Sequence, residues 1–386
     1  MARDFPLFTR MPAFAVAAAA AGSLVFIWFG YPAVVGLLVR FIGRRPVERR
    51  SPTAPLPSVS VLLASREHAE VIRARIANLV ASDFPASQLE VVVALDVDAR
   101  CRPQELEGAA PNLRCVVAAA PGGKALALNA AAAAATGDVL VFVDTFQRFA
   151  PNTIRYLTEP LADPTIGAVS GSLERGERGN RWHAIALYWR LERWLRECES
   201  GLHSAIGVTG AVYSMRARDW RPLPAGLILD DLFVPMRLVL NRRRIMFDAR
   251  ASAEDVRDIA PVAEFHRKVR TLTGNWQLCA LLPGVLLPWR NPVWAAFLCH
   301  KILRLFTPFL AIVLLGALIA ALAARIGPAP TMLGVAAAAA IIVALASRFN
   351  PSTAISRSVQ SLVLLPAAAA FALWRALRRD WTWAGS

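Results

Sequence analysis

The side chains in this sequence best placed to do chemistry are acidic residues that directly follow apolar runs. Asp96 follows the run LEVVVAL, Asp144 follows VLVFV, and Asp230 and Asp231 form an adjacent pair after LIL. A carboxylate can bind a hard cation, and two neighbouring carboxylates repel, which can raise the pKa of one toward neutral and suit it to accept a proton. The alternatives are a turn or helix-capping role for Asp144 and an exposed acidic loop for the pair.

A second candidate element is the turn P-G-G-K, in which Lys124 precedes an Ala-rich stretch. Glycines let backbone N–H groups approach a phosphate, and the N-terminus of a helix favours anions. The element is not a Walker P-loop, because Ala125 rather than Ser or Thr follows the lysine. A tight turn that only caps the helix explains the same residues, so the motif alone does not decide between the two roles.

These residues need elements that bring them to one place. The apolar pattern predicts strands over residues 59–63 and 89–95, with a helix over about residues 67–81 between them. The Ala-rich residues 125–135 predict a second helix, and another apolar strand then ends at Asp144. This alternation indicates an α/β fold, in which charged groups at strand ends face a phosphorylated ligand.

The composition indicates a membrane protein. The 386 residues are 56% hydrophobic with a mean hydropathy of +0.43, yet 18% are charged. Residues 12–39 contain no charged side chain and are long enough to cross a hydrocarbon layer of roughly 30 Å. A secretory signal is the alternative, but the apolar run exceeds the usual length of about 7 to 15 residues. Clustered arginines follow it, which predicts that the middle domain faces the cytoplasm.

Three more apolar segments lie near the end of the sequence, at residues 305–324, 332–346 and 359–373. The last two are short for a complete crossing. Three crossings leave the final arginines outside, against the positive-inside tendency, unless residues 277–289 also cross or one short segment does not. We therefore expect a multi-pass protein of the plasma or inner membrane and leave its topology open. The expected division is an anchor and basic linker over 1–50, an α/β domain over 51–280 and an interfacial and transmembrane part over 281–386.

The net charge of +15 does not indicate a nucleic-acid-binding protein, because the arginines gather beside apolar segments and no recognition motif is present. Membrane lipids and a phosphorylated substrate explain the charge better. The five cysteines form no CxxC pair and are expected to be reduced core residues. The five histidines show no zinc-ligand spacing, so no catalytic role is assigned to them.

Eight segments occur in a specific order: VSVLLAS, LEVVVALD, GGKALALN, GDVLVFVDTFQRF, GAVSGSL, VTGAVYSMR, ILDDLFVPMR and FHRKVRTLTGNWQL. Over residues 59–278 this series resembles the family 2 glycosyltransferases, and the flanking apolar segments resemble those of its membrane-embedded synthase branch. The resemblance implies a Rossmann-like domain of the GT-A kind that binds a nucleotide-sugar donor.

On the donor side, the resemblance implies that Asp96 contacts the nucleotide, with Asp98 in the same loop, and that Lys124 lies near the phosphates. Arg267 and Arg270 fall where the synthase branch has a Q-x-x-R-W segment beneath the diphosphate. An arginine fork suits phosphate oxygens. An amphipathic helix at the membrane surface is the competing interpretation of these two arginines.

At the reaction centre, the resemblance gives Asp144 the first acidic position of a D-x-D motif that holds a divalent cation, Mg or Mn. The second acidic position is occupied by Phe146, which cannot bind a metal. Asp231, beside Asp230, matches the general base that deprotonates the acceptor hydroxyl. Departures also occur at two other family motifs, so the donor sugar is not readable from the sequence.

The expected function is therefore an inverting, hexosyl-type membrane glycosyltransferase acting on a lipid or glycan acceptor. By resemblance, Thr209, Gly210 and Ala211 line the acceptor cleft. A tryptophan run is expected to form an acceptor or membrane surface, with core packing as the alternative; it consists of Trp182, Trp189 and Trp194. A catalytically degenerate scaffold of the same fold is the second hypothesis, supported by Phe146. A transporter is disfavoured, because the C-terminal apolar segments contain no acidic residue.

Overall fold

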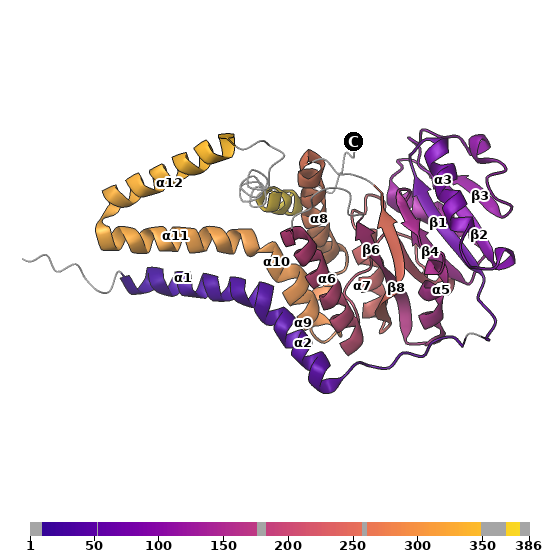
Figure 1. The fold of residues 1–386 in the computed structure, drawn as a ribbon, viewed down its shortest axis with the longest axis horizontal. Helices are drawn as coiled ribbons and strands as arrows, with labels where there is room; N and C mark the ends of the chain where they lie inside the picture. The colour runs from indigo at the N-terminus through magenta and orange to yellow at the C-terminus, as the bar shows by residue number, and fades with distance from the viewer. Residues whose placement is uncertain (1–9, 52, 176–182, 257–260, 349–367, 379–386) are drawn as a thin grey trace, which may run out of the picture.

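The computed structural model describes residues 10–51, 53–175, 183–256, 261–348 and 368–378. An α/β domain forms one end of the molecule, and a helical arm extends from it (Figure 1). The expected α/β domain and the predicted strand at 89–95 are confirmed.

The domain is built on one eight-stranded sheet in the order β3-β2-β1-β4-β7-β6-β8-β5. The first four strands in this order are parallel, and β7 pairs antiparallel with both β4 and β6. The order 3-2-1-4 is that of a Rossmann-like half sheet, whose carboxyl strand ends form a ligand-binding edge. The strands are β1 (Val59–Ser65), β2 (Leu89–Leu95), β3 (Leu113–Val117), β4 (Val139–Val143), β5 (Gln147–Phe149), β6 (Ile166–Arg175), β7 (Val212–Arg216) and β8 (Arg244–Asp255).

Strands β1, β2 and β4 are nearly continuous apolar runs because helices cover both faces of the sheet. Successive side chains of β1 point to opposite faces. Leu62 therefore lies in one core cluster, whereas Val61 and Leu63 lie in another. The helices of the domain are α3 (Ala69–Val80), α4 (Lys124–Ala134), α5 (Thr153–Thr158), α6 (His183–Leu202), α7 (Asp230–Leu240) and α8 (Pro261–Leu281).

The helical arm contains the two described helices that are long and apolar enough to cross a membrane. One is the stretch Pro12–Ile42, which covers α1 (Arg10–Val25) from Pro12 onward, a π-helical turn η2 (Phe26–Gly30) and α2 (Tyr31–Ile42). The other is α11 (Thr307–Ile326), which lies beside α1 (Figure 1). Length and composition are the evidence for crossing.

The remaining apolar segments differ from the expectation. Residues 332–346 lie inside a longer helix, α12 (Pro328–Arg348), which follows α11 after a turn and diverges from it (Figure 1). Residues 277–289 do not form one helix, because α8 ends at Leu281 and a 3-10 turn follows, η7 (Pro283–Leu286). Of residues 359–373, the part up to 367 lies outside the described residues, and 368–377 form a short apolar helix.

Between α2 and β1 the chain runs along the domain surface. The backbone N–H of Arg45 donates to the carbonyl of Gly201 at 2.7 Å, and Arg49 forms an ion pair with the buried Asp248, also at 2.7 Å. The basic linker is therefore fastened to the domain, and Arg49 in particular is neutralised within the protein.

After α8 and η7, the chain passes from the domain to α11 through α9 (Trp294–Phe297), a second π-helical turn η8 (Leu298–Ile302) and α10 (Leu303–Leu305). Both apolar helices thus leave the domain through a π-helical turn, a feature that often occurs at functional sites.

Candidate active site

Lys124 brings together acidic residues from two distant parts of the sequence. Its Nζ lies 3.0 Å from Oδ1 of Asp144, which follows β4, and 3.4 Å from Oδ2 of Asp230, the first residue of α7. Asp231 is the next residue. Burial opposes the charge on Lys124, but the negative charges of these three carboxylates outweigh it and raise the pKa of the lysine. The sequence-predicted residues 124, 144, 230 and 231 thus form one charged cluster at the sheet edge.

Two glycines give Lys124 its place at the start of α4. Gly122 and Gly123 have φ values of +87° and +101°, which residues other than glycine rarely adopt. A Cβ atom on Gly122 would lie 2.4 Å from Oδ1 of Asp96 and 2.5 Å from Val97. The turn therefore requires glycine for both conformation and space.

Asp96 fixes this turn to the end of β2. Its two carboxylate oxygens accept the backbone N–H of Gly123 at 2.9 and 3.0 Å, and Arg66 Nε donates to it at 2.7 Å. Burial opposes ionisation of Asp96, yet these donors hold its pKa below the ordinary value. Asp96 therefore organises the Gly-Lys turn. Asp98 lies exposed in the turn that follows. Their predicted nucleotide contacts stay predictions.

Asp231 has the electrostatic character of a proton acceptor. Burial first, and then the charge of Asp230, raise its pKa to about 6. Gly210 lies so close that a Cβ atom there would be 3.0 Å from the Asp231 Cβ. Among the described residues, no hydrogen bond or ion pair engages the Asp231 carboxylate. The carboxylate is thus available to a substrate hydroxyl.

The other predicted acceptor residues lie in different surroundings, and their role stays a prediction. The Thr209 hydroxyl donates to the carbonyl of Gly171 at 2.8 Å and accepts from Arg196 at 3.1 Å, so it supports the wall of the site. In α6, Trp194 packs against Gly36 of α2, while Trp189 meets Tyr188 edge-on. Trp182 lies outside the described residues.

The predicted arginine pair lies on α8. Arg270 is exposed, and its charge lowers the pKa of Asp231, which places it within electrostatic reach of that carboxylate. The backbone of Arg267 is helical, but its side chain lies outside what the structure describes.

Sequence reasoning missed Arg75, a fully buried arginine of α3. Its Nε donates to the main-chain carbonyl of Asp144 at 3.1 Å, and its guanidinium lies 4.4 Å from the centre of the Phe149 ring. Burial and then Arg148 lower its pKa to about 9. Arg75 thus positions the loop that carries Asp144. The helical pattern around it shows no signal that distinguishes it from a surface arginine.

The donor set for a divalent cation is small. In the described parts of the chain, no group of three or more His, Cys, Asp or Glu side chains could hold a metal ion. Asp144 is 38% exposed and supplies one hard oxygen ligand. Magnesium commonly uses one or two carboxylates together with substrate phosphates. The residues therefore fit a cation that is bound jointly with a diphosphate.

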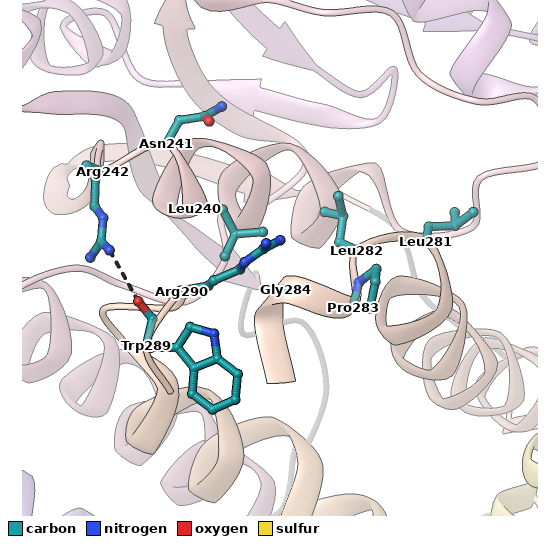
Figure 2. Close-up of a pocket in the computed structure, with 9 residues that line it drawn as sticks. All are labelled: Leu240, Asn241, Arg242, Leu281, Leu282, Pro283, Gly284, Trp289 and Arg290. Carbon is teal, nitrogen blue, oxygen red and sulfur yellow. Dashed lines mark hydrogen bonds between the residues drawn. The ribbon is translucent and has the colours of Figure 1, made fainter. Parts of the chain in front are cut away.

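Two hollows lie near these elements. One, of about 160 Å³, contains Asp231 and reaches η8. The other, of about 510 Å³, lies at the opposite end of α7, where Leu240, Arg242, Trp289 and Arg290 surround it (Figure 2). None of the described residues that line this larger hollow is a carboxylate. The smaller one is therefore the relevant cavity for chemistry.

The chain matches a known family over most of the α/β domain. The family described as "Glycosyltransferase like family 2" matches residues 57–274, more than half of the chain. An N-acetylglucosaminyltransferase of Rhizobium meliloti (strain 1021) is 28% identical over 159 residues, which are 40% of this chain and 36% of that protein. A beta-monoglucosyldiacylglycerol synthase of Synechocystis sp. (strain ATCC 27184 / PCC 6803 / Kazusa) is 25% identical over 242 residues, 58% of this chain and 49% of that protein. The matches thus span half or less of these curated relatives.

Among solved structures, the mannosyltransferase PcManGT from Pyrobaculum calidifontis, in complex with GDP-Man and Mn2+, has a TM-score of 0.71 at 21% identity. The match covers 96% of this chain and 99% of that one. At this identity the likeness shows the fold, and it includes the helical arm as well as the α/β domain.

Proposed function

We propose that this chain, which belongs to the glycosyltransferase like family 2, transfers a hexosyl group from a nucleotide diphosphate donor to a hydroxyl acceptor at a membrane surface. One observation carries the proposal. Lys124 pairs with both Asp144 and Asp230, so a cation suited to phosphate lies directly beside Asp231, a carboxylate suited to accept a proton.

In this proposal the donor diphosphate lies against the Gly-Lys turn. The ammonium of Lys124 leaves one of its two carboxylate partners and pairs with phosphate oxygens, where it stabilises the charge of the departing diphosphate. Arg270 and Arg267 of α8 are proposed to add to that stabilisation, and Asp96 keeps the turn in place.

Asp231 is proposed to act as the general base. It removes the proton of the acceptor hydroxyl while the oxygen attacks the anomeric carbon and the bond from that carbon to the diphosphate oxygen breaks. One displacement inverts the configuration at the anomeric carbon. A pKa of about 6 leaves Asp231 mostly ionised at neutral pH and still basic enough to take a proton.

We propose that Asp144 holds a Mg or Mn ion together with the donor phosphates. When bound, such a cation neutralises charge on the leaving diphosphate. PcManGT, which shares the fold, is described in complex with GDP-Man and Mn2+. Because Phe146 occupies the second acidic position of the D-x-D segment, Asp144 is the only carboxylate that this segment offers to a cation.

The membrane location of the reaction is also a proposal. The helices Pro12–Ile42 and Thr307–Ile326 support it by length and composition, and the basic residues after the first support a cytoplasmic domain. The acceptor is then a lipid or a membrane-held glycan.

A degenerate, non-catalytic protein of the same fold is the second candidate, and Phe146 is the observation that favours it. Purified full-length protein should be incubated with UDP-glucose, UDP-N-acetylglucosamine or GDP-mannose and Mg²⁺ or Mn²⁺, with nucleotide release and sugar transfer measured. We expect turnover with one donor and its loss in Asp231→Asn. Equal turnover of wild type and variant rejects Asp231 as the base, and absence of turnover with every donor favours the scaffold.

A further inference from the structure

The cavity behind Asp231 is lined by several charged and polar side chains. It encloses about 160 Å³ between α6, α7, α8 and η8. This is smaller than the roughly 300–1,000 Å³ of pockets for drug-sized ligands, so it suits one small headgroup. The polar residues that matter here are Arg196, Glu199, Asp231, Asn275, His300 and Lys301.

Lys301 is a buried cation of this cavity. Among the described residues, no ion pair or hydrogen bond reaches its ammonium. Burial and then the charge of Arg196 lower its pKa, and this outweighs the opposite effect of Glu192 and Glu199. The charge of Lys301 also lowers the pKa of Asp231, so the two side chains are within electrostatic reach of each other.

The nearby carboxylates are committed elsewhere. Glu192 accepts two hydrogen bonds from Arg304 at 2.9 Å and also bonds His300. Glu199 Oε1 accepts from the Tyr31 hydroxyl at 2.6 Å and lies 2.8 Å from Nδ1 of His300. The hydrogen bonds of these carboxylates are thus made to Arg304, Tyr31 and His300, and none of them is made to Lys301.

Two oxygens of the cavity walls also lack a donor. Oε2 of Glu199 and Oδ1 of Asn275 are buried without a hydrogen bond to any described residue, and a buried polar atom left unpaired costs about 1–3 kcal/mol. A ligand with hydroxyl groups can satisfy such acceptors. Arg196 uses one donor on Thr209 and retains others for an anion.

The cavity wall is connected to both apolar helices. Glu199 is hydrogen-bonded to Tyr31 within the helix Pro12–Ile42, and Lys301 lies in η8, six residues before α11 begins at Thr307. Because these two helices are proposed to cross the membrane, a molecule that reaches the cavity along them comes from the bilayer.

We propose that this cavity binds the headgroup of an anionic lipid that carries a free hydroxyl, with its phosphate or carboxylate at Lys301 and Arg196 and its hydroxyl at Asp231. The inference rests on the proposed function and narrows its acceptor. The acceptor oxygen then meets the general base while the anionic group is held on the side away from the donor diphosphate.

The test uses full-length protein in vesicles of phosphatidylcholine alone, or of phosphatidylcholine with phosphatidylglycerol, diacylglycerol or phosphatidylserine. Phosphatidylglycerol is anionic and hydroxylated, diacylglycerol is hydroxylated but neutral, and phosphatidylserine is anionic without a hydroxyl. Soluble glycerol 3-phosphate offers a phosphate and free hydroxyl groups without a membrane anchor. Transfer is expected to phosphatidylglycerol at least tenfold faster than to any other addition.

Lys301→Met is expected to raise the KM for phosphatidylglycerol about tenfold or more with the donor KM unchanged, which corresponds to the loss of one charged contact. Lys301→Arg should recover most of that loss. Arg242→Gln removes the same charge at the hollow of Figure 2 and should leave both KM values unchanged. If Lys301→Met does not fold, Arg196→Gln replaces it with the same expectation.

Other outcomes overturn the proposal. Equal transfer to diacylglycerol, or an unchanged acceptor KM in Lys301→Met, rejects an anion site. Faster transfer to soluble glycerol 3-phosphate rejects the lipid. Donor hydrolysis without transfer to any of these acceptors rejects the headgroup but leaves the proposed function standing, whereas no hydrolysis and no transfer rejects the proposed function itself.

Discussion

At the residue scale, the charge state of Asp231 determines the expected pH dependence. Its carboxyl is protonated below a pKa of about 6 and cannot then act as a base. We expect kcat/KM to rise with pH through about 6 and to level off near pH 7, because Lys124 stays charged over this range. A rate profile from pH 4.5 to 8.5 checks this, and a profile without an inflection near 6 contradicts the assignment.

The raised pKa of Asp231 also predicts an effect on stability. A folded-state pKa above the ordinary value of 3.8 means that the native protein binds the proton more tightly, so ionisation destabilises the fold as pH rises from about 4 through 6. Asp231→Asn should therefore be more stable than wild type at pH 7.5, by about 1 kcal/mol, and this advantage should shrink at pH 4.5. Thermal unfolding in detergent at both pH values measures it. A variant that is less stable than wild type at pH 7.5 contradicts the expected penalty.

The positive charge of Lys124 is expected to contribute to catalysis. Lys124→Met removes the cation shared by Asp144 and Asp230 and should lower kcat by about 10²–10³, the usual effect of losing one preorganised electrostatic contact. Lys124→Arg keeps the charge and should retain more activity. Donor affinity and kcat, measured separately, distinguish a role in the transition state from a role in binding alone. Equal activity of both variants contradicts a role for the positive charge.

The sequence predicted which acidic residues converge but not what organises them. Residues 96, 124 and 144 stand beside predicted strand and helix ends, and strand ends meet at one edge of a parallel sheet. Asp231 was assigned to the same site from the family resemblance. Arg75 could not be predicted, because its partner is a main-chain carbonyl 69 positions away. The network around His300 could not be predicted either, since its carboxylate partners lie 101 and 108 positions away.

At the element scale, the Gly-Lys turn couples β2 to the start of α4. Gly122→Ala places a Cβ 2.4 Å from Asp96 and imposes a strained φ, so we expect a loss of stability of about 1–3 kcal/mol and a raised donor KM. Gly108→Ala is the matched control, because Gly108 also has a positive φ, +73°, but no atom within 4 Å of its added Cβ. Both effects should be larger at Gly122. Equal losses in the two variants indicate backbone strain alone and reject the role of the contact with Asp96.

The elements themselves were predicted to different degrees. The strand at 89–95 has the predicted limits, and the helix expected at 125–135 is shifted by one residue, because apolar period and Ala content are local signals. The two π-helical turns were not predicted. Their sequences, the apolar FIWFG and the mixed LCHKI, share no composition that marks a widened turn.

At the scale of the whole molecule, specific contacts near η2 and η8 join the two apolar helices to each other, and a small core joins α2 to the domain. Trp28 donates through Nε1 to the Thr307 hydroxyl at 3.3 Å, and the guanidinium of Arg304 lies 4.9 Å from the centre of the Trp28 ring. Tyr31, Val35, Leu195 and Cys198 form a small core between α2 and α6. A change at this junction should therefore affect the domain without preventing insertion of the helix into a membrane.

Two glycines of the helix Pro12–Ile42 allow a matched test of this junction. A Cβ on Gly36 would lie 2.8 Å from the Trp194 ring of α6, whereas a Cβ on Gly22 meets no atom within 4 Å. Gly36→Leu should push α2 away from α6, lower stability by about 1–3 kcal/mol and reduce transfer to a membrane acceptor, since the wall residue Glu199 is held by Tyr31. Gly22→Leu should change neither. Both proteins should resist extraction from membranes at alkaline pH, because each helix remains apolar. Thermal unfolding and transfer rates then separate the two, and equal behaviour of both variants rejects a role for the α2–α6 contact in catalysis.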